Sequence, residues 1–325
     1  NQIIDVSGPL SNLILSDGIL YGTASYGPSG VEGTIFKINT DGTGFGILHS
    51  FINYVDGGYP KGSLIKSGNK LYGMAVGGGA NYQGTIFSCD LSGANFANIH
   101  NFTGSEGSSP SGSLTLVGST LYGMTPYGGE YNGGVLFSIE TNGSSFSVIR
   151  HLDNTGRSPK GTLILNGGKL YGLTHNGGNN DSGTVFDYDI TQDTFTTLAS
   201  FTGNNGLNPY GDLIRVGDDF YGMSRNGGTA DNGILFRYSP AIQWTGAFGT
   251  AWSDGLNWNK GEVPSGEQDV VILSSPANQP HVDQGVGSPA QCNNLTIEPG
   301  ASVTIDPEKA LTVAGNLTNL AGNAG

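Results

Sequence analysis

Sustained helical periodicity, long apolar runs and basic residues are all scarce in this sequence, and each shortage excludes a class of protein. No segment repeats its apolar residues with a period of 3.6, so we expect almost no helix. No apolar run approaches the ~18 residues that a membrane helix needs. Lys and Arg total only 13 and the formal net charge is −13, so nucleic acid and anionic lipid surfaces are not expected as partners.

Cysteine is also scarce, because the chain has only two, Cys89 and Cys292. They lie far apart in the sequence, which excludes a disulfide framework. Cys89 follows Phe87 by two positions, so both side chains point to the same side of a predicted strand. We therefore expect Cys89 to be a small buried apolar residue and not a reactive thiol.

Glycine, by contrast, is abundant at 56 residues, and much of it belongs to an internal repeat. The phrase Leu/Phe-Tyr-Gly recurs five times at intervals of about 50 residues, at 20–22, 71–73, 121–123, 170–172 and 220–222. A Gly-x-x-Phe phrase follows each copy, at 33–36, 84–87, 134–137, 183–186 and 233–236. A Pro-x-Gly-x-Leu phrase begins at 60, 110, 159 and 209, with a weaker copy at 9.

Each repeat contains four short runs of apolar and aromatic residues, which in the second repeat are 62–67, 70–76, 84–90 and 96–102. Gly, Asn and Ser turns separate the runs. Four strands in about 50 residues are typical of one propeller blade. Apolar residues follow one another within the runs because neighbouring blades cover both faces. The sequence therefore predicts an all-β fold whose first domain, residues 1–240, is a five-bladed β-propeller.

The two ends of the repeat array predict how the ring closes. The fifth repeat supplies three strands, at 213–217, 220–224 and 233–238, and then reaches Ser239-Pro240 without a fourth. Residues 2–6 occupy the place that a fourth strand holds before its Pro. We therefore predict that residues 2–6 pair with 233–238, which removes the open sheet edges that invite aggregation.

The repeat also resembles a known family. The units G-x-LYG-[MTL]-x-x-x-GG and G-[TVI]-[IVL]-F are similar to the GloVer repeat of secreted bacterial surface proteins, over about residues 8–238. The resemblance implies a protein of Bacteroidota that acts outside the cell or at its surface, after removal of a signal peptide. It also implies a C-terminal anchor or secretion module.

A second domain is predicted at residues 241–325, where the composition changes. All three tryptophans occur there, at Trp244, Trp252 and Trp258, and we expect them to form a core or a domain interface. Short β runs follow, with Leu295, Val303 and Leu311 eight residues apart, which suggests a small β-solenoid or β-sandwich-like domain. The pattern resembles linker modules of Bacteroidota adhesins exported by type IX secretion. A solenoid needs a polar terminal cap, and none is seen, so a longer adhesin-like C-terminal region is expected.

The long loops of the five repeats are predicted to share one face and to bind a ligand there. They carry aromatic and amide side chains, which suit the apolar faces and hydroxyl groups of sugars. The loops differ from repeat to repeat, so we predict one composite site and not five equivalent sites. An extracellular glycan or surface polymer is the expected partner. The candidate ligand-binding residues are Tyr82, Tyr127, Tyr131, His175 and Arg225, with Tyr210 at the channel rim.

Two other functions stay open at this point. A glycosidase or lyase would need two carboxylates about 5–10 Å apart. The predicted channel-lining positions are Asn12, Ser63, Ser113, Thr162 and Asp212. Asp212 is the one acid among them, so it is a weak catalytic candidate and enzymatic activity is disfavoured. The remaining alternative is a purely structural spacer of a surface appendage.

No metal site or cofactor is predicted. His49 and His100 occupy equivalent positions in adjacent repeats, which places them too far apart to share an ion. The sequence has no DxDxDG loop. Calcium held by loop carboxylates and carbonyl oxygens stays open, without support from any motif.

Overall fold

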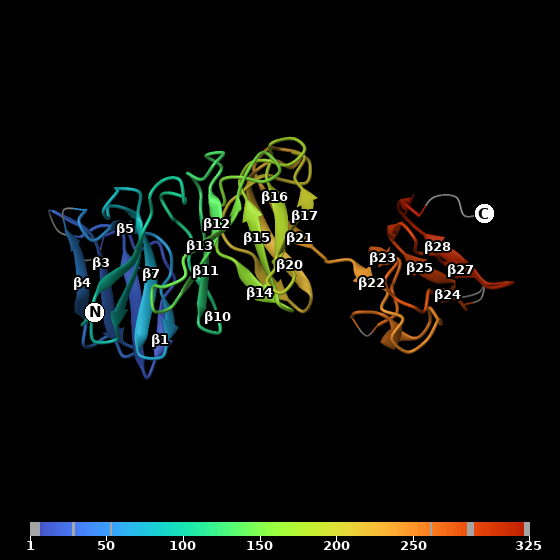
Figure 1. Ribbon diagram of the computed structural model, residues 1–325, viewed down its shortest axis with the longest axis horizontal. Helices are drawn as coiled ribbons and strands as arrows, with labels where there is room; N and C mark the ends of the chain where they lie inside the picture. Colours follow the sequence, from blue (N-terminus) through green and yellow to red (C-terminus); the bar gives the residue numbers. More distant parts are fainter. Residues whose placement is uncertain (1–6, 28–29, 53, 261, 285–288, 322–325) are drawn as a thin grey trace. The chain divides into compact units, whose positions relative to one another are not determined.

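The computed structural model describes residues 7–27, 30–52, 54–260, 262–284 and 289–321 (Figure 1). The chain divides into two compact units, Asn1–Arg215 with Tyr221–Phe236, and Val216–Phe220 with Arg237–Gly325. Strands dominate both, and the described residues contain one short 3₁₀ helix, η1 (Gly255–Asn257), and no α-helix. None of the described helices is long and apolar enough to cross a membrane. The predicted all-β fold is confirmed.

Sheets built from consecutive strands make up the repeat region, one sheet for each repeat. The first contains β1 (Ile14–Ser16), β2 (Ile19–Ala24), β3 (Val31–Asn39) and β4 (Gly46–Ile52). The second contains β5 (Gly58–Pro60), β6 (Ile65–Ser67), β7 (Lys70–Gly77), β8 (Thr85–Asp90) and β9 (Ala97–Asn101). The third contains β10 (Thr115–Val117), β11 (Thr120–Thr125), β12 (Val135–Glu140) and β13 (Ser147–His151). The fourth contains β14 (Ile164–Asn166), β15 (Lys169–Thr174), β16 (Thr184–Asp189) and β17 (Thr194–Ser200). The fifth contains β18 (Leu207–Pro209), β19 (Ile214–Val216), β20 (Asp219–Asn226) and β21 (Ile234–Tyr238).

The strand order supports the predicted repeat. In each of the first four sheets, four consecutive strands pair antiparallel in chain order, as neighbours in a meander. In the second sheet β7 also pairs with β5. These antiparallel sheets are the propeller-like repeats that the sequence predicts. In the fifth sheet, β20 pairs with β18, β19 and β21. The strand predicted to complete that sheet, residues 2–6, lies outside the described residues.

The recurring Tyr-Gly phrase has a steric cause. In the second sheet Gly73 faces Phe87 across the ladder between β7 and β8. A Cβ atom at Gly73 would lie 2.5 Å from Cζ of that ring, and a Cβ at Gly123 would lie 2.5 Å from Cζ of Phe137. The aromatic ring of Gly-x-x-Phe thus covers the glycine of Leu-Tyr-Gly, so the two phrases must recur together.

The apolar cores lie between consecutive sheets. One core joins Tyr72, Met74 and Ile86 of the second sheet to residues of the third sheet that include Leu114 and Phe137. The same arrangement joins the first sheet to the second, and the third to the fourth. Both faces of an inner sheet are therefore buried, as the continuous apolar runs predict.

The first and fifth sheets differ from the inner ones because they leave apolar faces exposed. Leu13 is 48% exposed, whereas the equivalent Leu114 is 3% exposed. Met223 and Leu235 of the fifth sheet are 64% and 73% exposed, whereas Met74 is 2% exposed. In the three cores described above, the equivalents of Leu13 and Leu235 lie in the same cluster. The described residues of the two end sheets thus leave exposed the apolar positions that are buried in the inner sheets.

Stacked histidine and phenylalanine rings join the outer strands of neighbouring sheets. The His49 ring lies 3.5 Å from the Phe96 ring, nearly parallel to it, and His100 stacks in the same way on Phe146 at 3.7 Å. Arg150 takes the equivalent place in the third repeat, with its guanidinium carbon 5.3 Å from the Phe195 ring centroid. Burial lowers the pKa of both imidazoles. The nearby carboxylates of Asp56 and Glu106 oppose that shift.

These histidines predict a loss of stability in mild acid. Their pKa values are lower in the fold than in the unfolded chain, so the unfolded chain binds more protons as the pH falls below about 6.5. The melting temperature should therefore fall between about pH 6.5 and 5, above the range in which carboxylates protonate. Replacing His49 and His100 with Phe should weaken this pH dependence. It should not abolish it, because burial also lowers the pKa of His175. An equal pH dependence in the variant and the parent, measured by calorimetry, would contradict the assignment.

The second unit is built from parallel ladders. One sheet contains β22 (Ile242–Gln243), β23 (Val270–Ile272), β26 (Leu295–Ile297) and β29 (Leu317–Asn319). Two shorter ladders pair β24 (His281–Val282) with β27 (Thr304–Ile305) and β25 (Ala290–Cys292) with β28 (Leu311–Val313). Parallel strands cannot be joined by a tight hairpin, so the chain must cross back to the same end of the sheet before each new strand begins.

The three tryptophans form the core of this unit. Trp244 and Trp252 are completely buried, and both contact the Trp258 ring edge-on at centroid distances of 4.9 and 4.7 Å. Trp258 donates its indole N–H to the Trp252 carbonyl oxygen at 2.9 Å. The prediction that these residues are core is confirmed. The two cysteines, Cys89 in the first unit and Cys292 in the second, are buried and unpaired. Burial raises the pKa of each thiol to about 11, as expected for apolar packing.

Candidate functional site

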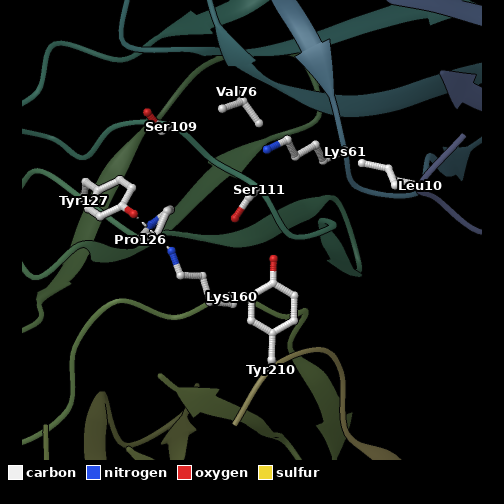
Figure 2. Close-up of a pocket in the computed structure, with 9 residues that line it drawn as sticks. All are labelled: Leu10, Lys61, Val76, Ser109, Ser111, Pro126, Tyr127, Lys160 and Tyr210. Carbon is white, nitrogen blue, oxygen red and sulfur yellow. Dashed lines mark hydrogen bonds between the residues drawn. The ribbon is translucent and has the colours of Figure 1, made fainter. Parts of the chain in front are cut away.

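A cavity of about 340 Å³ opens where the Pro-x-Gly phrases of all five repeats converge (Figure 2). The residue after the proline lines this cavity in every repeat, including the first, whose weaker copy of the phrase has Ser11 in place of the glycine. The five equivalent residues are Leu10, Lys61, Ser111, Lys160 and Tyr210. We call this set the mouth ring. One sequence position, repeated five times, thus surrounds a single space.

A second ring lies next to the mouth ring and lines a smaller cavity of about 140 Å³. It consists of the predicted channel-lining residues Asn12, Ser63, Ser113, Thr162 and Asp212. The backbone N–H of each of the first four donates to the side-chain oxygen of its equivalent in the next repeat. The donor–acceptor distances are 2.9, 2.8, 3.1 and 2.6 Å. The predicted channel positions are therefore neighbours, and side-chain hydrogen bonds join them from repeat to repeat.

Two tyrosines and a lysine form the best-defined part of the mouth. Tyr127 follows β11, and its backbone carbonyl accepts hydrogen bonds from the Thr125 hydroxyl and the Ser108 N–H, which fix its position. Its ring is 47% exposed. The Lys160 ammonium lies 3.2 Å from the Tyr127 hydroxyl and 4.7 Å from the ring centroid. Tyr210 comes from the fifth repeat, is 57% exposed, and points its hydroxyl into the same space (Figure 2).

The other wall of the mouth comes from the third position after each Leu-Tyr-Gly phrase. Val76 and Pro126 occupy this position in the second and third repeats and line the larger cavity. His175 and Arg225 are their equivalents. The His175 ring meets the Tyr210 ring edge-on at 6.1 Å, and Arg225 lines a hollow beside Tyr210. Burial lowers the pKa of His175. The Pro209 carbonyl opposes this shift, and the charges of Lys160 and Arg225 add to it.

Four of the six predicted ligand-binding residues are thus brought together: Tyr127, Tyr210, His175 and Arg225. Tyr82 and Tyr131 are 74% and 58% exposed, and neither is among the residues lining the cavities described here. Tyr131 instead lies beside Glu130, whose hydrogen bond and charge raise its pKa.

The sequence-based prediction missed Lys61 and Lys160. The signal was available, because both occupy the variable place of Pro-x-Gly, the same place as Tyr210. Apart from Tyr210, the predicted residues come from the long loops and the inner ring, and each mouth-ring residue lies between these two sets in the sequence. A variable residue inside an otherwise constant phrase was the feature to follow.

Asp212 keeps a place in the inner ring that the serines and threonine of the other repeats also fill. Its carboxylate oxygen accepts from the Thr162 N–H at 2.6 Å, as Ser63 and Ser113 accept in their repeats. No other carboxylate lines the two cavities among the described residues. No group of three potential metal ligands lies together in the described part of the chain.

Comparisons with known proteins identify both parts of the chain as family domains. The model of the Gloeobacter/Verrucomicrobia repeat matches residues 2–156 and 118–267. A domain of unknown function, DUF8693, matches residues 243–323. No curated protein matches the sequence. Among solved structures the chain is similar to a crystal structure of the nidogen/laminin complex, with 12% identity and a TM-score of 0.45. That similarity covers 69% of this chain and 76% of the other.

Proposed function

Since the chain belongs to the Gloeobacter/Verrucomicrobia repeat family, we propose that its repeat region is a binding module that takes a glycan at the mouth ring. One observation carries this proposal: the exposed rings of Tyr127 and Tyr210 converge with hydroxyl and ammonium donors on one cavity. Aromatic faces stack on the apolar faces of sugars, and the donors take sugar hydroxyl oxygens. The match confirms the repeat family. Neither family description names Bacteroidota, type IX secretion or adhesion, so an extracellular adhesive role stays a prediction.

The site is proposed to be single because the five equivalent positions of the mouth ring hold four different residue types. A protein with five equal pockets would need the same contacting residue in each repeat. Here one position holds leucine, lysine, serine and tyrosine around a shared cavity. One ligand per chain is therefore expected.

The proposed fold of the repeat region is a closed, five-bladed propeller. Closure is supported by the shared cavities, which residues of all five repeats line, and it would bury the apolar faces that the two end sheets leave exposed. For the second unit we propose a short β-solenoid, supported by its three parallel ladders. A small antiparallel sandwich would not give this pairing.

Substitution of the mouth tyrosines tests the binding proposal. A glycan array would first identify a ligand, and titration calorimetry would then give affinity and stoichiometry. Tyr127→Ala and Tyr210→Ala should each weaken binding by ~5- to 150-fold, because each removes ~1–3 kcal/mol of stacking and packing. The melting temperature should stay nearly unchanged, since both rings are substantially exposed.

Tyr82→Ala and Tyr131→Ala are matched controls, because these tyrosines are exposed and line neither cavity of the mouth. They should change affinity much less. A stoichiometry near five, or equal losses for all four variants, would overturn the single site at the mouth. Failure of every glycan to bind would favour the alternative of a structural spacer.

A further inference from the structure

Two lysine side chains reach the same small space at the mouth. Lys61 and Lys160 belong to the second and fourth repeats, and each lines both the larger and the smaller cavity. The whole chain has only 13 basic residues and a net charge of −13. Two of these few cations therefore converge on one cavity of an acidic protein, where their mutual repulsion opposes the arrangement.

No carboxylate of the described residues neutralises this pair within the mouth. The one acid that lines either cavity is Asp212, and one of its oxygens is already held by the Thr162 N–H. Among the described residues, the Lys160 ammonium contacts a neutral group there, the hydroxyl and ring of Tyr127. The positive field also reaches His175. Burial is the main cause of its lowered pKa, and the charges of Lys160 and Arg225 lower it further.

A buried hydroxyl in the mouth, that of Ser111, has no hydrogen-bond partner in the described part of the chain. Ser111 lines both cavities. A buried hydroxyl without a partner costs free energy, so such groups usually meet a water or a ligand. Ser111, Lys160 and Tyr210 all line the larger cavity (Figure 2). Two ammonium groups and a hydroxyl thus offer donors to one acceptor-rich ligand.

We propose that the glycan bound at the mouth is acidic, with a uronic-acid carboxylate held by Lys61 and Lys160. Ser111 donates to the same group or to a neighbouring oxygen, and the sugar rings stack on Tyr127 and Tyr210. This inference rests on the proposed glycan-binding function and names the chemical class of its ligand. It also accounts for the two lysines, which a neutral sugar would leave without a counter-charge.

The test compares each acidic glycan with its own uncharged form. Pectin, alginate and hyaluronan fragments would be titrated beside counterparts whose carboxylates are reduced to alcohols. At least one acidic fragment should bind ~10-fold or more tightly than its reduced counterpart, the size of one well-formed charge contact. Its affinity should fall as salt rises. Lys61→Met with Lys160→Met should abolish the preference for the acid. Lys66→Met is the matched control, because Lys66 is exposed on β6 and lines neither cavity.

The outcomes separate this inference from the function on which it rests. If a neutral or carboxyl-reduced glycan binds as tightly as any acid and depends on Tyr127 and Tyr210, the acidic ligand is wrong and the binding module stands. If acidic fragments bind but the double lysine variant binds them equally well, the assignment of Lys61 and Lys160 is wrong. If no glycan binds at all, both proposals fail. Unchanged melting temperatures of the variants would show that lost affinity does not come from unfolding.

Discussion

Gly62→Ala is expected to lower the free energy of unfolding by about 3 kcal/mol, at the upper end of the usual cost of overpacking. Gly62 is the glycine of Pro-x-Gly in the second repeat. A Cβ atom there would run into the backbone carbonyl of Gly112, and one at Gly112 would run into that of Gly161. The obstacle is backbone, which cannot rotate away as a side chain can. The two repeats would have to move apart, and their shared core with them.

Thermal unfolding measured by calorimetry would check this expectation. For a unit of this size the loss corresponds to a fall in melting temperature of roughly 10 °C. Gly46→Ala is the matched control, because the nearest atom to a Cβ there is Cε of Lys37 at 3.8 Å. It should leave stability unchanged or raise it slightly. Equal melting temperatures for the two variants would show that the repeats do not approach each other so closely.

This close approach explains why so much of the fold follows from the sequence. Each recurring phrase makes a contact that is found again in the next repeat. The phrases are Pro-x-Gly-x-Leu, Leu-Tyr-Gly and Gly-x-x-Phe. Gly62 allows the next repeat to approach, Gly73 accommodates the Phe87 ring, and Leu114 fills the core against the preceding sheet. Contacts of this kind tolerate few residue types. Because these contacts repeat, the sheets, their order and their cores can be predicted from this one sequence without any alignment.

The site was less predictable because its residues are the variable ones. The inner ring could be placed from the phrases, and its hydrogen bonds join the predicted residues. The five mouth-ring positions hold four residue types, so the repeat marks the position as variable and does not single out Lys61 or Lys160. Their convergence on one cavity is shown only by the three-dimensional arrangement. Tyr82 illustrates the opposite error, since a loop aromatic looks equally suitable in sequence and yet lines no part of the mouth.

The parallel ladders of the second unit were only half predictable, for a related reason. The short apolar runs and the buried tryptophans follow from composition. The pairing does not, because a short run such as Leu295–Ile297 suits a parallel or an antiparallel neighbour equally well.

Leu235→Glu is expected, if the ring closes as proposed, to destabilise the repeat region by about 3–5 kcal/mol, the cost of an uncompensated buried charge. This residue is 73% exposed on the fifth sheet, yet its equivalent in the third repeat, Leu136, is completely buried. In the first three pairs of consecutive sheets, the residue at this position lies in the same core cluster as the Leu of Pro-x-Gly-x-Leu of the next repeat. If the ring closes as proposed, Leu235 meets Leu13 of the first repeat. Leu13→Glu should then destabilise to a similar degree.

Two controls decide how the result is interpreted. Leu136→Glu places a charge at a completely buried position and should give the largest loss of stability. Leu165→Glu lies at a site 40% exposed on β14 and should change stability by less than about 0.5 kcal/mol. If the ring is closed, the loss of stability caused by Leu235→Glu and by Leu13→Glu should approach that caused by Leu136→Glu. If the ring is open, both variants should lose as little stability as Leu165→Glu. Removal of residues 1–7 would then leave the melting temperature unchanged. Because Leu10 and Tyr210 line the mouth from the same two end repeats, an open ring would also leave one wall of the proposed binding site free to move.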